Sequence, residues 1–174
     1  MAKWTDNRAL SVLTFGLGDE IFALEAASVR EILDMVPVTG VPKADPFVDG
    51  LINVRGRVAP LADLRIKLGI ELRPPTIDSR IVVIEIDLSG DATLVGIRAD
   101  KVCEVVDLLP STLEEAPRIG MMWPPEFIRC IAKRGTDFIV VLDIDRMFAS
   151  GPGAGPAIEA IPRERAAGPA ATAP

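Results

Sequence analysis

Two stretches of the chain, FALEAASVREI at Phe22–Ile32 and VGIRADKVCEV at Val95–Val105, resemble each other at a constant offset of 73 residues, the distance from Phe22 to Val95. Further along, FVDGLINVRGRVAPLADL at Phe47–Leu64 resembles FIRCIAKRGTDFIVVLDI at Phe127–Ile144. The same order of apolar runs and turns in both halves predicts an internal duplication. Because each half alone is too small to bury a large core, we expect the two halves to pack together.

Short runs rich in Val, Ile, Leu and Phe, separated by turns that contain glycine, predict strands. These runs are Ser11–Leu17, Ile21–Leu24, Val48–Val54, Val58–Leu61, Arg80–Leu88, Thr93–Ile97, Ile128–Lys133 and Phe138–Leu142. Short strands joined by tight turns favour small antiparallel barrels over a parallel sheet. We therefore expect an all-β fold of two packed five-stranded barrels, with short helices at Asp63–Leu68 and Asp143–Phe148.

The domain organisation follows from the repeat and from a change in composition near Ser150. We expect one domain over 1–150, with barrel subdomains at roughly 10–75 and 76–150, and an exchange of strands between them is left open. In residues 151–174, 17 of 24 residues are Gly, Ala or Pro, and no apolar face is present. This composition predicts a disordered tail, either passive or carrying a short recruitment motif around Ile158–Arg165.

The composition excludes several classes of function. The 174 residues include no His, so the chain has no His-based catalytic triad, phosphohistidine relay or histidine metal site. The formal net charge is −6 and the pI is about 4.8, and there is no Tyr. This charge disfavours binding to nucleic acid or to an anionic membrane. The N-terminus lacks the apolar core of a signal peptide, and no run is long enough to span a bilayer, so we expect a cytoplasmic protein.

Carboxylates are the remaining candidates for chemistry. Asp143 and Asp145 could form a metal or general-acid pair, but Asp is also expected where a strand gives way to a helix. We therefore predict no catalytic residue, no metal and no cofactor, and keep as an alternative a small-barrel enzyme or ligand-binding domain with a pocket lined by Asp63, Asp143 and Asp145. Cys103 and Cys130 lie in apolar runs without metal-ligand spacing, which favours buried, reduced thiols over a disulfide or a redox switch.

Two polar features stand out from the apolar frame. Glu31 lies in the segment VREI, and Asn53 and Arg55 lie beside Gly56 in a tight turn. Arg forms strong hydrogen bonds to a carboxylate, so Glu31 is the expected partner of Arg55 if their strands are neighbours. Because Glu104 and Arg134 occupy matching positions, the pair is either a structural feature of each barrel or a charged centre of a binding surface.

The chain closely resembles the CheW family of bacterial chemotaxis coupling proteins from about Leu10 to Phe148. The resemblance rests on LTFGLGDEIFALEAASVREIL, VPKADPFVDGLINVRGRVAPLADLRIKLGI and RIVVIEI followed by VGIRADKVCEVVDL. The most specific part is PFVDGLINVRG at Pro46–Gly56, where the family commonly has Leu in place of Val54. The segment Ile119–Pro125 and the tail lie outside the shared pattern.

The resemblance implies a non-catalytic adaptor built from two SH3-like barrels, located in the cytoplasm at membrane receptor arrays. Its partners would be the regulatory domain of a CheA-type histidine kinase and the cytoplasmic tips of methyl-accepting chemoreceptors. A coupling domain of a CheV-type protein is a further alternative. Carried over to this sequence, the partner-binding residues are those at the polar pair and around it, Val29, Glu31, Gly50, Asn53, Arg55 and Gly56.

Overall fold

The computed structural model describes residues 8–117, 120 and 122–149. The tail predicted at 151–174 lies outside the described residues and stays a prediction. Among the described residues, no helix has the length and apolar character needed to cross a membrane.

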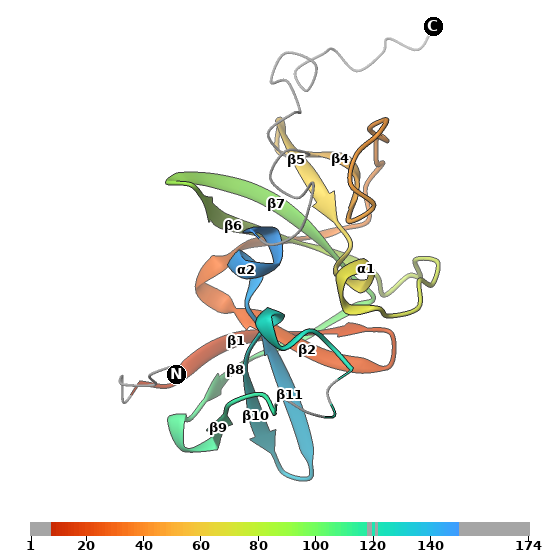
Figure 1. Cartoon of the computed structure of the whole chain (residues 1–174). Coiled ribbons are helices and arrows are strands. Elements are labelled where there is room, and N and C mark those ends of the chain that lie inside the picture. The colour runs from red at the N-terminus through yellow and green to blue at the C-terminus, as the bar shows by residue number, and fades with distance from the viewer. Residues whose placement is uncertain (1–7, 118–119, 121, 150–174) are drawn as a thin grey trace, which may run out of the picture.

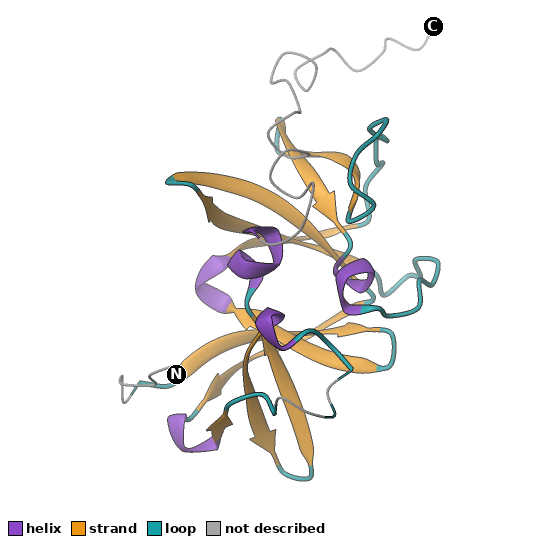
Figure 2. Ribbon diagram, in the orientation of Figure 1, coloured by secondary structure: helices purple, strands orange, loops and turns teal. Residues whose placement is uncertain are grey.

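Eleven strands and five short helices make up the described chain, and strands dominate it (Figures 1 and 2). In chain order the elements are β1 (Leu10–Leu17), β2 (Glu20–Glu25), η1 (Ala26–Ser28), β3 (Val29–Asp34), β4 (Val48–Val54), β5 (Arg57–Ala62), α1 (Leu64–Leu68), β6 (Arg80–Leu88), β7 (Asp91–Ala99), β8 (Lys101–Leu108), η2 (Pro110–Thr112), β9 (Leu113–Glu114), η3 (Pro125–Phe127), β10 (Ile128–Arg134), β11 (Asp137–Leu142) and α2 (Ile144–Ala149).

The strands form two sheets, with the short helices α1 and α2 between them (Figure 1). One sheet has the order β8-β1-β2-β11-β10-β9, and the other has the order β3-β6-β7-β5-β4. Most neighbouring strands are antiparallel, as the tight turns predict. The all-β, two-barrel fold is therefore confirmed, and the six-stranded sheet differs from the prediction only by the two-residue strand β9.

The two sheets exchange strands between the halves of the chain. The hairpin β1–β2 from the first half pairs with β8 and β11 of the second half, and the hairpin β6–β7 pairs with β3 and β5 of the first half. The sequence boundary between 10–75 and 76–150 therefore does not separate the sheets. Each barrel needs strands from both halves, so neither half is a complete folding unit.

The register of the strands shows the duplication directly. The parallel pairing of Val141 with Ala23 is repeated by Leu61 with Gly96, which are the matching positions in the other half. Both β4 and β10 also carry an irregularity at the same place, between Val48 and Gly50 and between Ile128 and Cys130. These coincidences in backbone geometry support the weak sequence repeat.

Buried side chains form one core between the sheets and a smaller one inside each barrel. The core between the sheets includes Phe47, Phe127 and Phe148, and the rings of Phe47 and Phe148 lie 5.1 Å apart. It unites the barrels into a single body, because burial of aromatic and aliphatic side chains supplies most of the folding free energy.

Candidate functional site

A partly exposed ion pair joins an edge strand to a hairpin turn in the five-stranded barrel. The Nε of Arg55, in the β4–β5 turn, donates a hydrogen bond of 2.7 Å to Oε2 of Glu31 on β3. β3 and β4 are the two edges of this sheet, and the chain after β3 closes it through a bridge between Thr39 and Leu51. This closure places the two charged residues side by side although 24 residues separate them.

The two members of the pair are unequally exposed. The side chain of Arg55 is 79% exposed, whereas that of Glu31 is 21% exposed, and Oε1 of Glu31 is buried without a hydrogen-bond partner among the described residues. A largely buried carboxylate thus holds one N–H of a guanidinium group that is itself mostly exposed to solvent. An arginine held in this way can donate further hydrogen bonds to an incoming carboxylate or carbonyl.

Local backbone chemistry explains the position of Arg55. Arg55 and Gly56 have φ angles of 51° and 81°, the left-handed conformation that two-residue hairpin turns require. The N–H of Gly56 donates a hydrogen bond of 2.7 Å to the side-chain oxygen of Asn53, which fixes the turn. Asn53 and Gly56 therefore hold Arg55 at the tip of the hairpin.

The other two predicted residues support this region from below. Gly50 has a φ of 154°, and a Cβ placed on it would lie 2.7 Å from Cγ1 of Val38. Gly50 thus allows the closing segment to cross β4. Val29 begins β3 and packs, partly buried, against the core between the sheets. The structure brings Glu31, Asn53, Arg55 and Gly56 together, while Gly50 and Val29 lie in the frame that positions them.

The second barrel carries a corresponding pair. Nη1 of Arg134, at the end of β10, lies 2.6 Å from Oε1 of Glu104 on β8, and the two side chains are 56% and 50% exposed. Arg134 is the last residue of its strand, whereas Arg55 lies inside the turn. Because the second carboxylate is more exposed than Glu31, the two pairs are similar in position but not in rigidity.

Exposed apolar residues beside the two pairs were not identified from the sequence. Ile32 and Val58 lie beside the first pair along the chain and are 43% and 36% exposed, and their repeat equivalents Val105 and Phe138 are 60% and 59% exposed. The offsets of 73 and 80 residues that relate the repeats also relate these residues. The alignment of the repeats therefore already matched these apolar residues, but their exposure to solvent became known only from the structure.

Two of the three carboxylates named in the enzyme alternative, Asp63 and Asp143, form local hydrogen bonds. Asp63 is buried and forms a hydrogen-bonded ion pair with Arg65, in which Arg65 Nη2 lies 2.7 Å from Asp63 Oδ2. Asp143 accepts a hydrogen bond of 3.1 Å from the N–H of Arg146 in α2. Burial, and the neighbouring charge of Asp143, raise the pKa of Asp145. Within the described ranges, no group of three or more Cys, Asp or Glu could hold a metal ion.

The two cysteines differ in their exposure to solvent. Cys130 is buried inside the six-stranded barrel, and burial raises the pKa of its thiol to about 11. Cys103 is exposed on β8, so the prediction that both thiols are buried is wrong for Cys103. The reason is the position of β8 at an edge of the sheet, where even an apolar run stays open to solvent.

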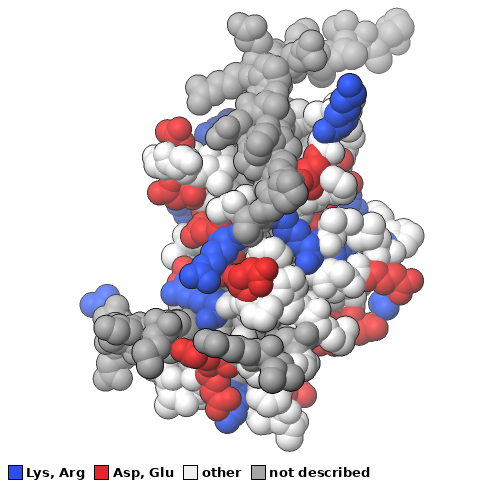
Figure 3. All heavy atoms as spheres, in the orientation of Figure 1, with Lys and Arg blue, Asp and Glu red and all other residues white. Residues whose placement is uncertain are grey.

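Acidic and basic side chains are interspersed over the face shown in Figure 3. The two Glu–Arg pairs and the exposed apolar side chains lie on a surface of mixed charge. The fold and the candidate site thus define a class of small, duplicated β-barrel proteins.

Comparisons with known proteins specify the class further. The family model for the CheW-like domain matches residues 11–151. A chemotaxis protein CheW of Rhizobium meliloti is 28% identical over 149 residues, covering 86% of this chain and 94% of the relative. The chemotaxis protein CheW of Bacillus subtilis is 30% identical over 138 residues, covering 79% of this chain and 85% of the relative.

A solved structure is also similar. The scaffolding protein TtCheW from Thermoanaerobacter tengcongensis matches with a TM-score of 0.72 and 29% identity, over 82% of this chain and 94% of that one. The chain belongs to the CheW-like family, and it acts as an adaptor protein of chemotaxis-type signalling.

Proposed function

We propose that this chain couples the cytoplasmic tips of methyl-accepting chemoreceptors to the regulatory domain of a CheA-type histidine kinase, without catalysis of its own. It would work in the cytoplasm, at receptor arrays beneath the membrane. The proposal rests on membership of the CheW-like family and on the surface around Arg55.

The observation that carries the proposal is the asymmetry of the Glu31–Arg55 pair. Exposed ion pairs contribute about 0–1 kcal/mol to the free energy of folding, so such a pair alone stabilises the fold only slightly. At a protein interface, however, an oriented arginine surrounded by apolar contacts is a frequent centre of binding energy. Arg55 is oriented by Glu31 and by the turn, and Ile32 and Val58 lie exposed beside the pair in sequence.

The rigid frame favours this use of Arg55. Asn53, Gly56 and Glu31 restrict the guanidinium before any partner arrives, so less conformational entropy is lost on binding. We infer that Gly50 and Val29, which the resemblance places among the partner-binding residues, maintain this geometry. Glu31, Asn53, Arg55 and Gly56 would form or present the binding surface.

Reconstitution from purified components tests the proposal. The full chain is immobilised and incubated with a CheA-type kinase, with a cytoplasmic receptor fragment, and with both together. We expect each partner to be retained, and receptor control of kinase autophosphorylation to appear only when this chain is present. Retention of neither partner, or control that is equally strong without the chain, would overturn the proposal.

A further inference from the structure

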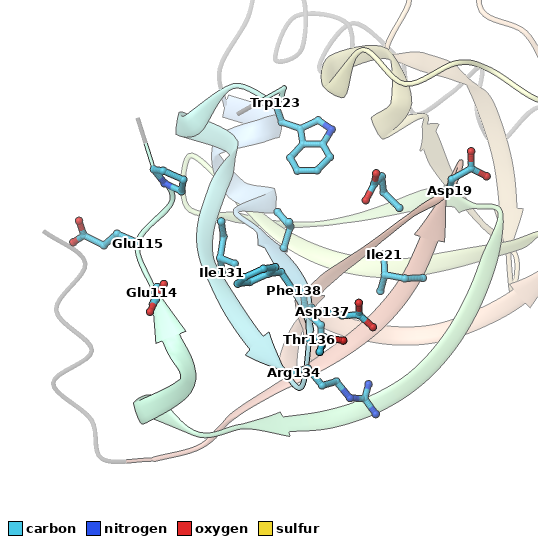
Figure 4. A pocket seen from close by; sticks show the side chains of 14 residues that line it. Asp19, Ile21, Glu114, Glu115, Trp123, Ile131, Arg134, Thr136, Asp137 and Phe138 are labelled. Carbon is cyan, nitrogen blue, oxygen red and sulfur yellow. The ribbon is translucent and has the colours of Figure 1, made fainter. Parts of the chain in front are cut away.

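The outer side of the six-stranded barrel contains an open groove of about 940 Å³ (Figure 4). Its apolar lining includes Ile21 of β2, Ile131 of β10, and Phe138 of β11. Trp123, just before η3, closes one side and packs edge-on against Phe22, with ring centroids 5.2 Å apart. The exposed ring of Phe138 gives the groove an apolar surface that no described residue covers.

Carboxylates surround this apolar surface. Asp19 and Glu114 are neutralised by ion pairs to Arg73 and Lys133. A further three lining residues, Glu20, Glu115 and Asp137, have no ion-pair partner in the part of the chain that the structure describes.

Among the described lining residues the one basic side chain, Arg134, is already paired with Glu104. A ligand that fits the groove therefore has an apolar side chain next to two or more positive charges. Such a segment would bury its apolar group against Phe138 and neutralise Glu20, Glu115 or Asp137.

The chain itself contains a segment of this kind beyond α2. In residues 150–174, which lie outside the described part, large apolar and basic side chains occur only in IEAIPRER at Ile158–Arg165. In an extended conformation Ile161, Arg163 and Arg165 lie on one face and Glu164 on the other. Pro162 favours the extended conformation at the residue before it.

The point where the chain leaves the fold makes the groove accessible to this segment. α2 ends at Ala149 and contacts η3, which begins two residues after Trp123 in the wall of the groove. Ile161 follows Ala149 by twelve residues, which span up to about 40 Å when extended.

We propose that Ile161–Arg165 binds this groove as an extended segment, with Ile161 against Phe138 and with Arg163 and Arg165 facing Glu115 and Asp137. Because the segment is tethered, its effective concentration is about millimolar, so even a weak contact is substantially occupied. A partner that needs the Phe138 surface must first displace the segment. This inference does not depend on the identity of the kinase or the receptor.

Fluorescence quenching of Trp123 tests the proposal in the full-length chain. The chain contains two Trp residues, so Trp4→Phe leaves Trp123 as the single reporter. In this background, R163E/R165E in the tail is expected to raise the acrylamide quenching constant of Trp123 by about twofold, because a tethered ligand at millimolar concentration is lost. The matched control E164Q, on the opposite face of the segment, is expected to leave quenching unchanged.

A charge exchange separates binding from local disturbance. E115R/D137R in the groove should raise quenching as the tail variant does, and combining it with R163E/R165E should restore the protection. Circular dichroism and the melting temperature of each variant establish that it is folded. Equal quenching in the starting protein and the tail variant would overturn the proposal. So would protection that increases with protein concentration, because the occupant would then be a second copy of the chain.

Discussion

Lys67 of α1 and Met147 of α2 occupy equivalent positions in the two halves of the chain, and the Lys67 ammonium group donates a hydrogen bond to the main-chain oxygen of Met147. The same ammonium group lies 4.4 Å from the centre of the Phe47 ring. Lys67 therefore joins the two short helices in the region where the two barrels meet. It places a positive charge at the C-terminal end of α2, where the helix dipole favours a cation.

Replacing Lys67 with Met should destabilise the protein at pH 7 by about 1 kcal/mol. The variant loses the cation–π contact and leaves the Met147 oxygen without this donor, while the Met side chain fills much of the same volume. Urea denaturation measures the difference. A variant as stable as the parent would show that burial of the charge cancels these contacts.

The pH dependence of the same pair of proteins is a separate prediction. Burial lowers the pKa of Lys67 below its ordinary value of 10.5, and Asp45 only partly opposes this effect. Between the lowered pKa and 10.5 the unfolded chain binds more protons at this site, so stability from this site rises with pH. The parent should therefore gain stability relative to Lys67→Met as the pH increases toward 10.5. A difference that stays constant or shrinks over this range would contradict the assignment.

Arg65→Leu should destabilise the protein by about 3–5 kcal/mol, because it leaves the carboxylate of Asp63 buried without its partner. Arg65 also donates hydrogen bonds of 3.3 Å to Asp100 and 3.0 Å to the main-chain oxygen of Arg73. Chemical denaturation of the variant measures the loss. Arg73→Ala, which removes an exposed pair with Asp19, is the matched control and should have little effect. Equal effects of the two substitutions would contradict this account of the buried pair.

Gly50→Ala should cost at least about 2 kcal/mol, because the new methyl group would collide with Val38 and with the main-chain oxygen of Thr39. Gly40→Ala offers a control in the same region, since a Cβ there meets nothing within 4 Å. That substitution should be neutral or slightly stabilising, because alanine restricts the unfolded chain. The melting temperatures of both variants test this prediction. Similar decreases in melting temperature for Gly50→Ala and Gly40→Ala would contradict it.

Most of the fold could be predicted from the sequence because turn chemistry and apolar runs are local signals. Val48–Val54 and Arg80–Leu88 were predicted with the bounds that the structure shows. The strands β3 and β8 were not delimited, since each lies at a sheet edge and intersperses charged residues with apolar ones. Edge strands expose both faces in part, so they lack a long apolar run.

The exchange of hairpins between the halves could not be predicted from local patterns. Whether β1–β2 pairs with β3 or with β8 is decided by contacts between residues far apart in the sequence. The sequence did predict the contact of Glu31 with Arg55. A Glu and an Arg recur at the matching positions Glu104 and Arg134, and this recurrence singled out Glu31 as the partner of Arg55. It could not indicate that Glu31 is mostly buried and Arg55 mostly exposed, since this asymmetry comes from the crossing of the segment after β3.

The central claim is that Arg55 serves partner binding more than folding, and the affinity of Arg55→Ala for the kinase regulatory domain tests it most directly. Truncating an arginine at the centre of an interface costs about 2 kcal/mol or more, which corresponds to roughly thirtyfold in affinity. We predict a loss of this size with a nearly unchanged melting temperature, and a smaller loss for the matched variant Arg134→Ala. If both variants instead lose stability to a similar degree and bind the kinase as tightly as the parent, the two Glu–Arg pairs are structural features of the barrels and the claim is contradicted.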